Sequence, residues 1–179
     1  MNPSSLLCLL NLCLFASLGM AAPDRMRFAM EDRPIEGVPV EAFELIDENL
    51  TIELWARSPL IYSPVAMDFD AQGRLWLTEG IDYQRGLRIE EGRSIMVLED
   101  QDGDGEADSS HVFVTEKEIR HAPLGIAVFD NRIVLSATPS IIVYTDVDRD
   151  AVFDPKIDRR EVFLDGFQNK NHDHSVHGV

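Results

Sequence analysis

Short runs of alternating apolar and polar residues follow one another from about residue 49 onward, and this pattern is typical of half-buried β-strands. Residues 64–70 and 73–77 form one pair of such runs around a tight turn. Residues 123–129 and 131–135 repeat the pair with similar residue types. Each pair therefore predicts a strand, a turn and a second strand.

A second repeat concerns strands that lead into acidic loops. The first loop begins at Asp100 and the second begins at Asp146, 46 residues later (146 minus 100). An apolar run precedes each loop and another follows it. These flanking runs are residues 95–98, 111–114, 141–144 and 161–164.

The two repeats together predict four strands per unit, in the same order in each unit. Ordered units of this kind favour an all-β fold, a β-propeller of four-stranded antiparallel blades. A β-sandwich is the alternative, although a sandwich does not require an ordered repeat. Because propellers have about four to eight blades and residues 49–179 hold about two and a half, we expect an incomplete, N-terminal part of a propeller.

The N-terminal segment differs in pattern from the rest of the chain. Residues 1–22 contain an uncharged apolar run followed by small residues, so they predict a secretory signal peptide. A short membrane anchor is the alternative. Residues 23–48 have no clear period and predict an extended lead-in, with a helix over residues 40–46 as a weak alternative. We therefore expect export to the periplasm or the extracellular space, with membrane association as a further option.

Composition excludes several classes of protein. The chain has 16 Lys and Arg against 32 Asp and Glu, and a net charge of -16 repels nucleic acid. A hydrophobic content of 45% is too high for a disordered chain. Both cysteines, Cys8 and Cys13, lie in the predicted signal peptide, so the mature chain has no disulfide, thiolate metal site or C-x-x-C-H haem attachment.

The first acidic loop matches positions one, three, five, six, seven and nine of a D-x-D-x-D-G calcium loop, with Gly105 at the sharp turn. Position twelve is His111, where an EF-hand has a bidentate Glu, so we expect a calcium loop between strands instead. A solvated hairpin turn is the alternative, since such turns also favour Asp and Gly. The candidate ligands are Asp100, Asp102, Asp104, Glu106 and Asp108.

The second acidic loop is the poorer calcium candidate. Ala151 replaces the glycine of the first loop, and Ala resists a positive φ. Its candidate ligands are Asp146, Asp148, Asp150 and Asp154.

Three of the five histidines lie in residues 171–178, where the first strand of a third unit is expected to begin. Polar residues at this point of a propeller would lie at one mouth of the channel, where propellers bind ligands. A solvated loop and adventitious binding of a transition metal by imidazoles are the alternatives.

Residues 64–76, the Asp100 loop and residues 171–178 together resemble the large planctomycete-type membrane-bound dehydrogenases. Those proteins are similar to the six-bladed propellers of soluble quinoprotein glucose and sorbosone dehydrogenases. The resemblance covers residues 49–179. It implies a propeller that holds pyrroloquinoline quinone (PQQ) at its axial face.

The resemblance also implies roles for individual residues. In the quinoprotein glucose dehydrogenases an Asp-His pair precedes the inner strand of a blade, and its histidine is the general base. Asp173 and His174 match that pair. Arg120 and His121 occupy the equivalent loop one blade earlier, where the family places a polar cofactor contact, and here only the position matches. Longer relatives often carry a haem-binding module, which implies an electron acceptor such as a c-type cytochrome.

These features favour an exported quinoprotein-type dehydrogenase that oxidises a sugar or a related alcohol. His174 would take the hydroxyl proton and the quinone would take the hydride. The rival interpretation is a non-catalytic propeller, stabilised by calcium, that binds a ligand or partner. Fold alone does not separate the two, because propellers serve many functions.

Overall fold

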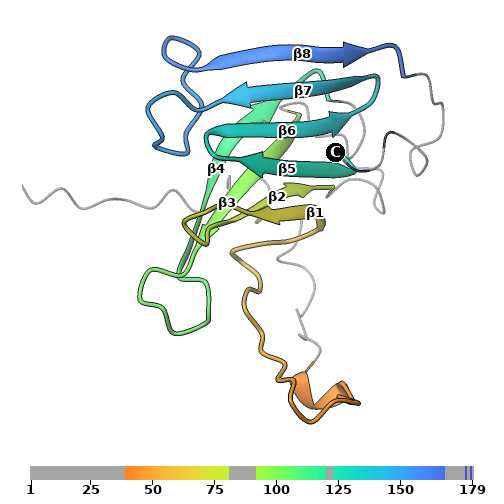
Figure 1. The fold of residues 1–179 in the computed structure, drawn as a ribbon, viewed down its shortest axis with the longest axis vertical. Helices are drawn as coiled ribbons and strands as arrows, with labels where there is room; N and C mark the ends of the chain where they lie inside the picture. The colour runs from red at the N-terminus through yellow and green to blue at the C-terminus, as the bar shows by residue number, and fades with distance from the viewer. Residues whose placement is uncertain (1–38, 81–91, 120–122, 168–175, 177, 179) are drawn as a thin grey trace, which may run out of the picture.

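The computed structural model describes residues 39–80, 92–119, 123–167, 176 and 178. Within these ranges the chain forms eight β-strands in two four-stranded antiparallel sheets, and the only helix is the short 3₁₀ turn Val40–Ala42 (Figure 1). The first sheet contains β1 (Pro64–Phe69), β2 (Leu75–Glu79), β3 (Arg93–Glu99) and β4 (Ser109–Glu116). The second contains β5 (Gly125–Phe129), β6 (Arg132–Ala137), β7 (Ser140–Thr145) and β8 (Arg159–Asp165).

The strand order in each sheet is the order along the chain, β1-β2-β3-β4 and β5-β6-β7-β8. All eight strands expected from the alternating pattern are confirmed, and so is the all-β class. The alternating run at residues 51–56 is different, because it belongs to neither sheet. A helix over residues 40–46 is not formed beyond the 3₁₀ turn.

Local side-chain chemistry explains the first hairpin of each sheet. The carboxylate of Asp70 accepts hydrogen bonds from the backbone N–H groups of Gln72 (3.0 Å) and Arg74 (2.9 Å), and Gly73 takes a φ of 83° that only glycine adopts readily. In the second sheet Phe129 pairs with Arg132, so Asp130 and Asn131 form a two-residue turn with φ 57° at Asp130. Asp and Asn are the residues that tolerate this conformation best after glycine.

The main core lies between the two sheets. Trp76 of β2, Phe113 of β4 and Tyr144 of β7 are almost fully buried there, and Phe113 packs edge-on against both of the other rings. Alternate residues of β2 point the other way, so Leu75 and Leu77 join a second cluster under residues 55–62. Because β2 is covered on both faces, all five of its residues are buried.

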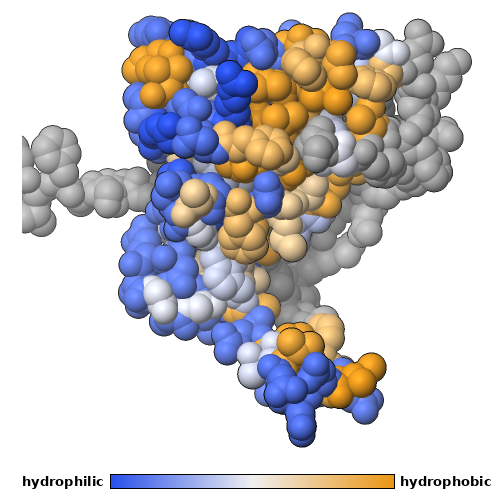
Figure 2. Space-filling view, viewed as in Figure 1, coloured by the Kyte–Doolittle hydropathy of each residue, from blue (hydrophilic) through white to orange (hydrophobic). Residues whose placement is uncertain are grey.

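The two sheets meet along their first strands. β1 and β5 lie next to each other, and the backbone N–H of Val128 donates to Oδ2 of Asp68 over 2.7 Å. By contrast β8 lies at the edge of the second sheet, and Figure 2 shows apolar side chains gathered over this sheet on the face in view. Val162, Phe163 and Leu164 of β8 are each at least 47% exposed. The edge strand β8 thus leaves large apolar side chains exposed.

No helix in the part of the chain that the structure describes is long and apolar enough to cross a bilayer.

Candidate functional site

The two acidic loops connect equivalent strands. The first joins β3 to β4 and the second joins β7 to β8, so both leave their sheets at the end that also carries the β1-β2 and β5-β6 turns. In Figure 1 the first loop, in green, lies at the lower ends of β3 and β4, and the second, in blue, lies at the left ends of β7 and β8. The repeat read from the sequence is therefore a repeat in space.

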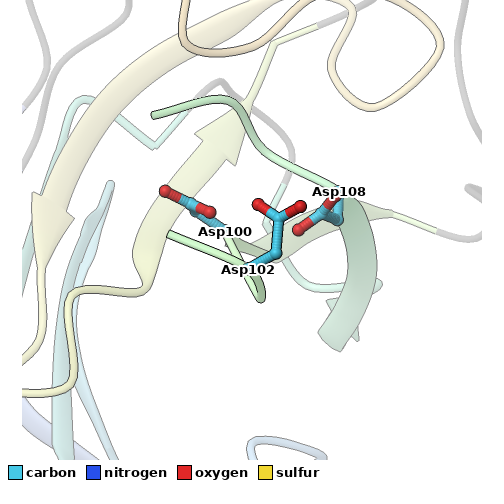
Figure 3. A group of neighbouring side chains, drawn as sticks. All are labelled: Asp100, Asp102 and Asp108. Carbon is cyan, nitrogen blue, oxygen red and sulfur yellow. The ribbon is translucent and has the colours of Figure 1, made fainter. Parts of the chain in front are cut away.

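The first loop folds around the carboxylate of Asp100. Its two oxygens accept hydrogen bonds from the backbone N–H groups of Gly103 (2.7 Å) and Gly105 (3.0 Å). Asp108 closes the loop by accepting the N–H of Gln101 over 2.6 Å. Figure 3 shows the carboxylates of Asp100, Asp102 and Asp108 turned toward a common point, and each offers an oxygen within 4.8 Å of the others.

Two of the expected ligands of this loop lie outside that group. Asp104 and Glu106 are exposed, and the Asp104 carboxylate accepts the N–H of Glu106 over 2.8 Å. The structure thus brings together three of the five candidate carboxylates, including the late ligand Asp108.

The second loop has the same conformation as the first. Asp146 accepts the N–H groups of Arg149 (2.8 Å) and Ala151 (3.0 Å), in the places of Gly103 and Gly105. Arg149 and Ala151 have φ angles of 65° and 59°, so both enter the left-handed region that glycine occupies in the first loop.

The expectation that Ala151 would resist a positive φ is wrong for this loop. Its side chain is fully buried and belongs to the core between the sheets. Burial of the methyl group stabilises the fold by about 0.8 kcal/mol, which is comparable to the cost of about 1 kcal/mol for a left-handed residue with a Cβ. The replacement of glycine by Ala151 is therefore no argument against calcium binding by this loop.

The carboxylate that completes the second group is Asp158. Asp146, Asp148 and Asp158 offer oxygens within 4.8 Å of one another, whereas Asp150 and the expected late ligand Asp154 lie outside the group. Oδ1 of Asp158 accepts the N–H of Val147 over 2.8 Å, as Asp108 accepts that of Gln101. The interval from the first to the last Asp is 12 residues here and eight in the first loop, and this difference hid the equivalence in the sequence.

Burial distinguishes the second group from the first. Asp146 and Asp158 are only 3% and 7% exposed, whereas Asp102 and Asp108 are exposed. Desolvation and then repulsion from Asp150 and Asp158 raise the pKa of Asp148 above its usual value. Carboxylate oxygens in close proximity are the donors that Ca²⁺ prefers, so both groups have the right chemistry for it.

A cavity of about 480 Å³ lies between the two loops and reaches down to Trp76 and Ile133. Its walls carry both signs of charge. Arg74 is paired with Asp70 at 2.6 Å, and Arg149 makes two bonds of 2.7 Å to Asp130. Asp100 and Asp146 also line it, so the first carboxylate of each acidic loop faces the same cavity.

The candidate catalytic and cofactor residues follow strands that end away from the acidic loops. Asp173, His174, Arg120 and His121 all lie outside the described residues. The strands before them, β4 and β8, run opposite to β3 and β7 and therefore end away from the acidic loops. The two sets of candidate residues thus follow opposite ends of the strands.

A buried carboxylate, Glu79, lies at that second end and was not recognised from the sequence. Glu79 ends β2 and is 2% exposed, and its Oε1 accepts the N–H of Tyr62 over 3.1 Å. Its Oε2 has no hydrogen-bond partner among the described residues. Burial raises the pKa of Glu79 above its ordinary value. A Glu at the end of a strand is usually solvated, so the sequence offered no signal of its burial.

Comparison with known proteins gave one family and two solved structures. A family described as "Domain of unknown function (DUF7133)" matches residues 40–179. No curated protein matches this chain.

Both solved structures are of Trichoderma reesei carbohydrate-active enzymes of family AA12, one described as an iodide structure and the other as a calcium structure. The first is 19% identical with a TM-score of 0.39, covering 60% of this chain and 24% of that one. The second is 20% identical with a TM-score of 0.36, covering 55% of this chain and 22% of that one. The chain thus spans about a quarter of their length, and similarity at this level carries no argument about function.

Proposed function

The chain belongs to the DUF7133 family of domains of unknown function, and we propose that it is the N-terminal part of a β-propeller in an exported quinoprotein-type dehydrogenase. Its substrate would be a sugar or a related alcohol, and its electron acceptor a c-type cytochrome. The propeller, the metal and the catalytic centre are supported by different observations.

The observation that supports the propeller is a hydrogen bond that recurs between the second strand of each sheet and the chain that follows that sheet. The hydroxyl of Thr78 on β2 donates to the carbonyl of Pro123 over 2.9 Å, just before β5 begins. The hydroxyl of Ser136 on β6 donates in the same way to Gly178 over 3.1 Å. The chain leaving the second sheet therefore returns to β6 as the chain leaving the first returns to β2. Repetition of one such step about an axis produces a propeller.

Calcium in the two acidic loops is supported by the donor set. Asp100, Asp102 and Asp108 form one group of oxygens, and Asp146, Asp148 and Asp158 form the other. The buried Asp146 anchors its loop by accepting two backbone N–H groups, so the loop is shaped before a cation binds. A cation there would relieve the repulsion that raises the pKa of Asp148.

The catalytic part of the proposal rests on the match of Asp173 and His174 to the family pair. The described residue Gly178 lies beside the start of β5, because a Cβ on Gly125 would come within 3.0 Å of the Gly178 nitrogen. This approach brings the chain that follows His174 to the first strand of the second sheet. His174 would then accept the proton of the substrate hydroxyl, and Asp173 would orient its ring.

The described residues alone do not form a binding site for PQQ. A quinone with three carboxylates needs several cations, and at this end of the first sheet the described cations near the strand ends are Arg93 and Lys117. The buried Glu79 adds a carboxylate of the wrong sign for that purpose. PQQ would accept the hydride when bound.

The decisive experiment is turnover of sugars and alcohols by the product of the complete gene, reconstituted with PQQ and calcium. His174→Gln keeps a polar side chain but removes proton acceptance, so it should lower turnover by about 100-fold or more while PQQ still binds. His172→Gln is the matched control and should retain activity. Equal losses in both variants, or no loss in either, would contradict the assignment of His174.

A non-catalytic, calcium-stabilised binding module is the second candidate. The cavity between the acidic loops favours it, because polar side chains of both sheets converge there. If reconstituted protein oxidises no substrate but binds calcium through both loops, this second function is the better one.

A further inference from the structure

Both sheets build the walls of the cavity between the acidic loops. In the first sheet, the β1-β2 turn contributes Gln72 and the acidic loop contributes Gln101. In the second sheet, the β5-β6 turn contributes Asn131 and the acidic loop contributes Arg149. The volume of about 480 Å³ lies within the range of about 300–1,000 Å³ that small-molecule sites occupy. A small polar molecule therefore has room between the two sheets.

The charged side chains on the walls disfavour an anionic ligand. They comprise two guanidinium groups and four carboxylates: Arg74, Arg149, Glu99, Asp100, Asp130 and Asp146. Arg149 makes two bonds of 2.7 Å to Asp130, so this cation is already compensated. Arg74 is compensated in the same way by Asp70, at 2.6 Å. A phosphate or a carboxylate ligand would therefore meet an excess of negative charge on these walls.

The excess of carboxylates does not make the cavity a site for a cationic ligand either. Both oxygens of Asp100 accept backbone N–H groups of the first loop, and both oxygens of Asp146 do so in the second. These two carboxylates also belong to the candidate metal groups, so a cation that they attract would lie within the loops. The charges that remain on the walls are two carboxylates and two guanidinium groups, which balance. The cavity is therefore suited to a neutral ligand.

The walls offer hydrogen bonds that a hydroxyl group can use. The carboxamides of Gln72, Gln101 and Asn131 each carry an acceptor oxygen and an NH₂ donor. The amide nitrogens of Gln101 and Asn131 donate within the protein, whereas their oxygens accept no hydrogen bond from the residues that the structure describes. A hydroxyl group both donates and accepts, so it can bond to carboxamides and to paired charges alike.

The inner end of the cavity is apolar. Trp76 and Ile133 are both buried there. The indole N–H of Trp76 already donates to Asp70 over 2.8 Å, so the ring has no polar group left for a ligand. A sugar ring combines an apolar C–H surface with several hydroxyl groups, and this combination matches an apolar inner end with polar walls.

We propose that this cavity is a binding site for a neutral saccharide, which it holds without converting it. The inference rests on the second candidate function, the binding module, and names the ligand class of that site. It is also compatible with the dehydrogenase, in which the cavity would be a separate site from the one assigned to His174. The charged walls would then select neutral sugars over acidic ones.

Isothermal titration calorimetry on the product of the complete gene, saturated with calcium and free of PQQ, tests the ligand class. Glucose, glucosamine and glucuronate share a ring and differ in charge. Glucose should bind, glucosamine should bind with similar affinity, and glucuronate should bind at least about tenfold more weakly. A preference of about tenfold or more for either charged sugar would overturn the proposal. No binding of glucose or of cellobiose at millimolar concentrations would also overturn it.

Two variants, one in each sheet, test the location of the site. Arg149 has a φ of 65°, so Arg149→Gly removes the guanidinium group without straining the backbone. Gln72→Ala removes an exposed carboxamide from the turn of the first sheet. Each should weaken glucose binding by about three- to tenfold. The matched control Lys156→Gly removes a like charge from the second acidic loop outside the cavity, and should leave the affinity unchanged. Equal affinities in the parent protein and both cavity variants would overturn the proposal, since the sugar would then bind elsewhere.

These measurements separate the inference from the dehydrogenase. Glucose binding that Arg149→Gly weakens, in a protein that oxidises no sugar, would support the saccharide site and remove the catalytic assignment. Turnover of a sugar by a protein whose glucose affinity neither cavity variant changes would do the reverse.

Discussion

Tyr144 of the second sheet donates its phenolic proton to Oε1 of Glu116 in the first sheet over 2.5 Å. The Nε–H of Arg160 donates to the same oxygen, also over 2.5 Å. One carboxylate therefore connects a strand end of the first sheet to two strands of the second. Burial, and then the neighbouring Glu116, raise the pKa of Tyr144 far above its ordinary value. The phenol therefore remains a donor throughout the usual pH range.

Tyr144→Phe should weaken the contact between the sheets. It removes one hydrogen bond to a charged acceptor and leaves the ring in the core, so we expect a loss of about 1.5–3 kcal/mol in the free energy of unfolding. Urea denaturation gives the value. In the double variant with Glu116→Ala the two losses should not add, since both changes remove the hydrogen bond between Tyr144 and Glu116. Fully additive losses would show that the bond does not contribute.

Asp158→Asn should remove most of the calcium effect on the second loop, whereas Asp154→Asn should preserve it. Asp158 belongs to the carboxylate group and Asp154 does not. Calcium at about 100 times its Kd adds about 2.7 kcal/mol of stability, which raises the Tm by several degrees. Differential scanning calorimetry with and without calcium measures the shift. Equal shifts in both variants would place the cation elsewhere, and no shift in the parent chain would favour solvated turns.

Asp70→Asn should lower the free energy of unfolding at neutral pH, and should lower it much less at acidic pH. Burial acts to raise the pKa of Asp70, but hydrogen bonds from Trp76 and Arg74 outweigh it and leave the pKa lowered. A lowered pKa stabilises the fold above the unfolded value of about 3.8, and this stability is lost as pH falls below it. We expect a loss of about 1–3 kcal/mol at pH 7. Urea unfolding of the parent chain and the variant at about pH 7 and pH 3 measures the loss of stability at each pH. An equal loss at both pH values would show that the charge of Asp70 does not stabilise the fold.

Glu79→Gln should stabilise the fold at neutral pH, whereas Asp70→Asn should destabilise it. Burial raises the pKa of Glu79, so its carboxyl favours folding at low pH and penalises it as pH rises above the unfolded value of 4.5. The amide keeps an oxygen for the N–H of Tyr62 and carries no charge. We expect a Tm higher by roughly 2–4 °C at pH 7, with the gain disappearing near pH 4. A lower Tm at pH 7 would mean that the ionised form has a partner.

Much of the fold follows from local pattern. The eight strands could be located because apolar and polar residues alternate, and the turns at residues 70–73 and 130–131 mark where the first hairpin of each sheet reverses. The acidic loops could be aligned because their first residues, Asp100 and Asp146, follow equivalent strands. Burial could not be predicted in the same way. The buried Glu79 bonds to Tyr62, 17 residues away, and Glu116 meets Arg160 across 44 residues.

The second acidic loop shows why residue spacing alone did not identify the third carboxylate of its group. Position nine of the first loop is Asp108, and the same count in the second loop leads to Asp154. The chain instead makes a longer excursion and returns at Asp158, which bonds to the backbone as Asp108 does. The Ala151 prediction was wrong for a related reason, because its methyl group is stabilised by packing that a loop pattern does not contain. The assignments at Arg120, His121, Asp173 and His174 stay predictions.

The excursion between Ala151 and Asp158 makes the second loop a natural insertion point for protein engineering. Its shorter counterpart shows that the carboxylate geometry does not depend on a fixed number of intervening residues. Ala151 and Asp158 are anchored on both sides, while Lys156 is exposed between them. An epitope tag or a reporter peptide placed next to Lys156 would lengthen the segment by which the two acidic loops differ, and the entropic cost of closing a loop grows only slowly with its length.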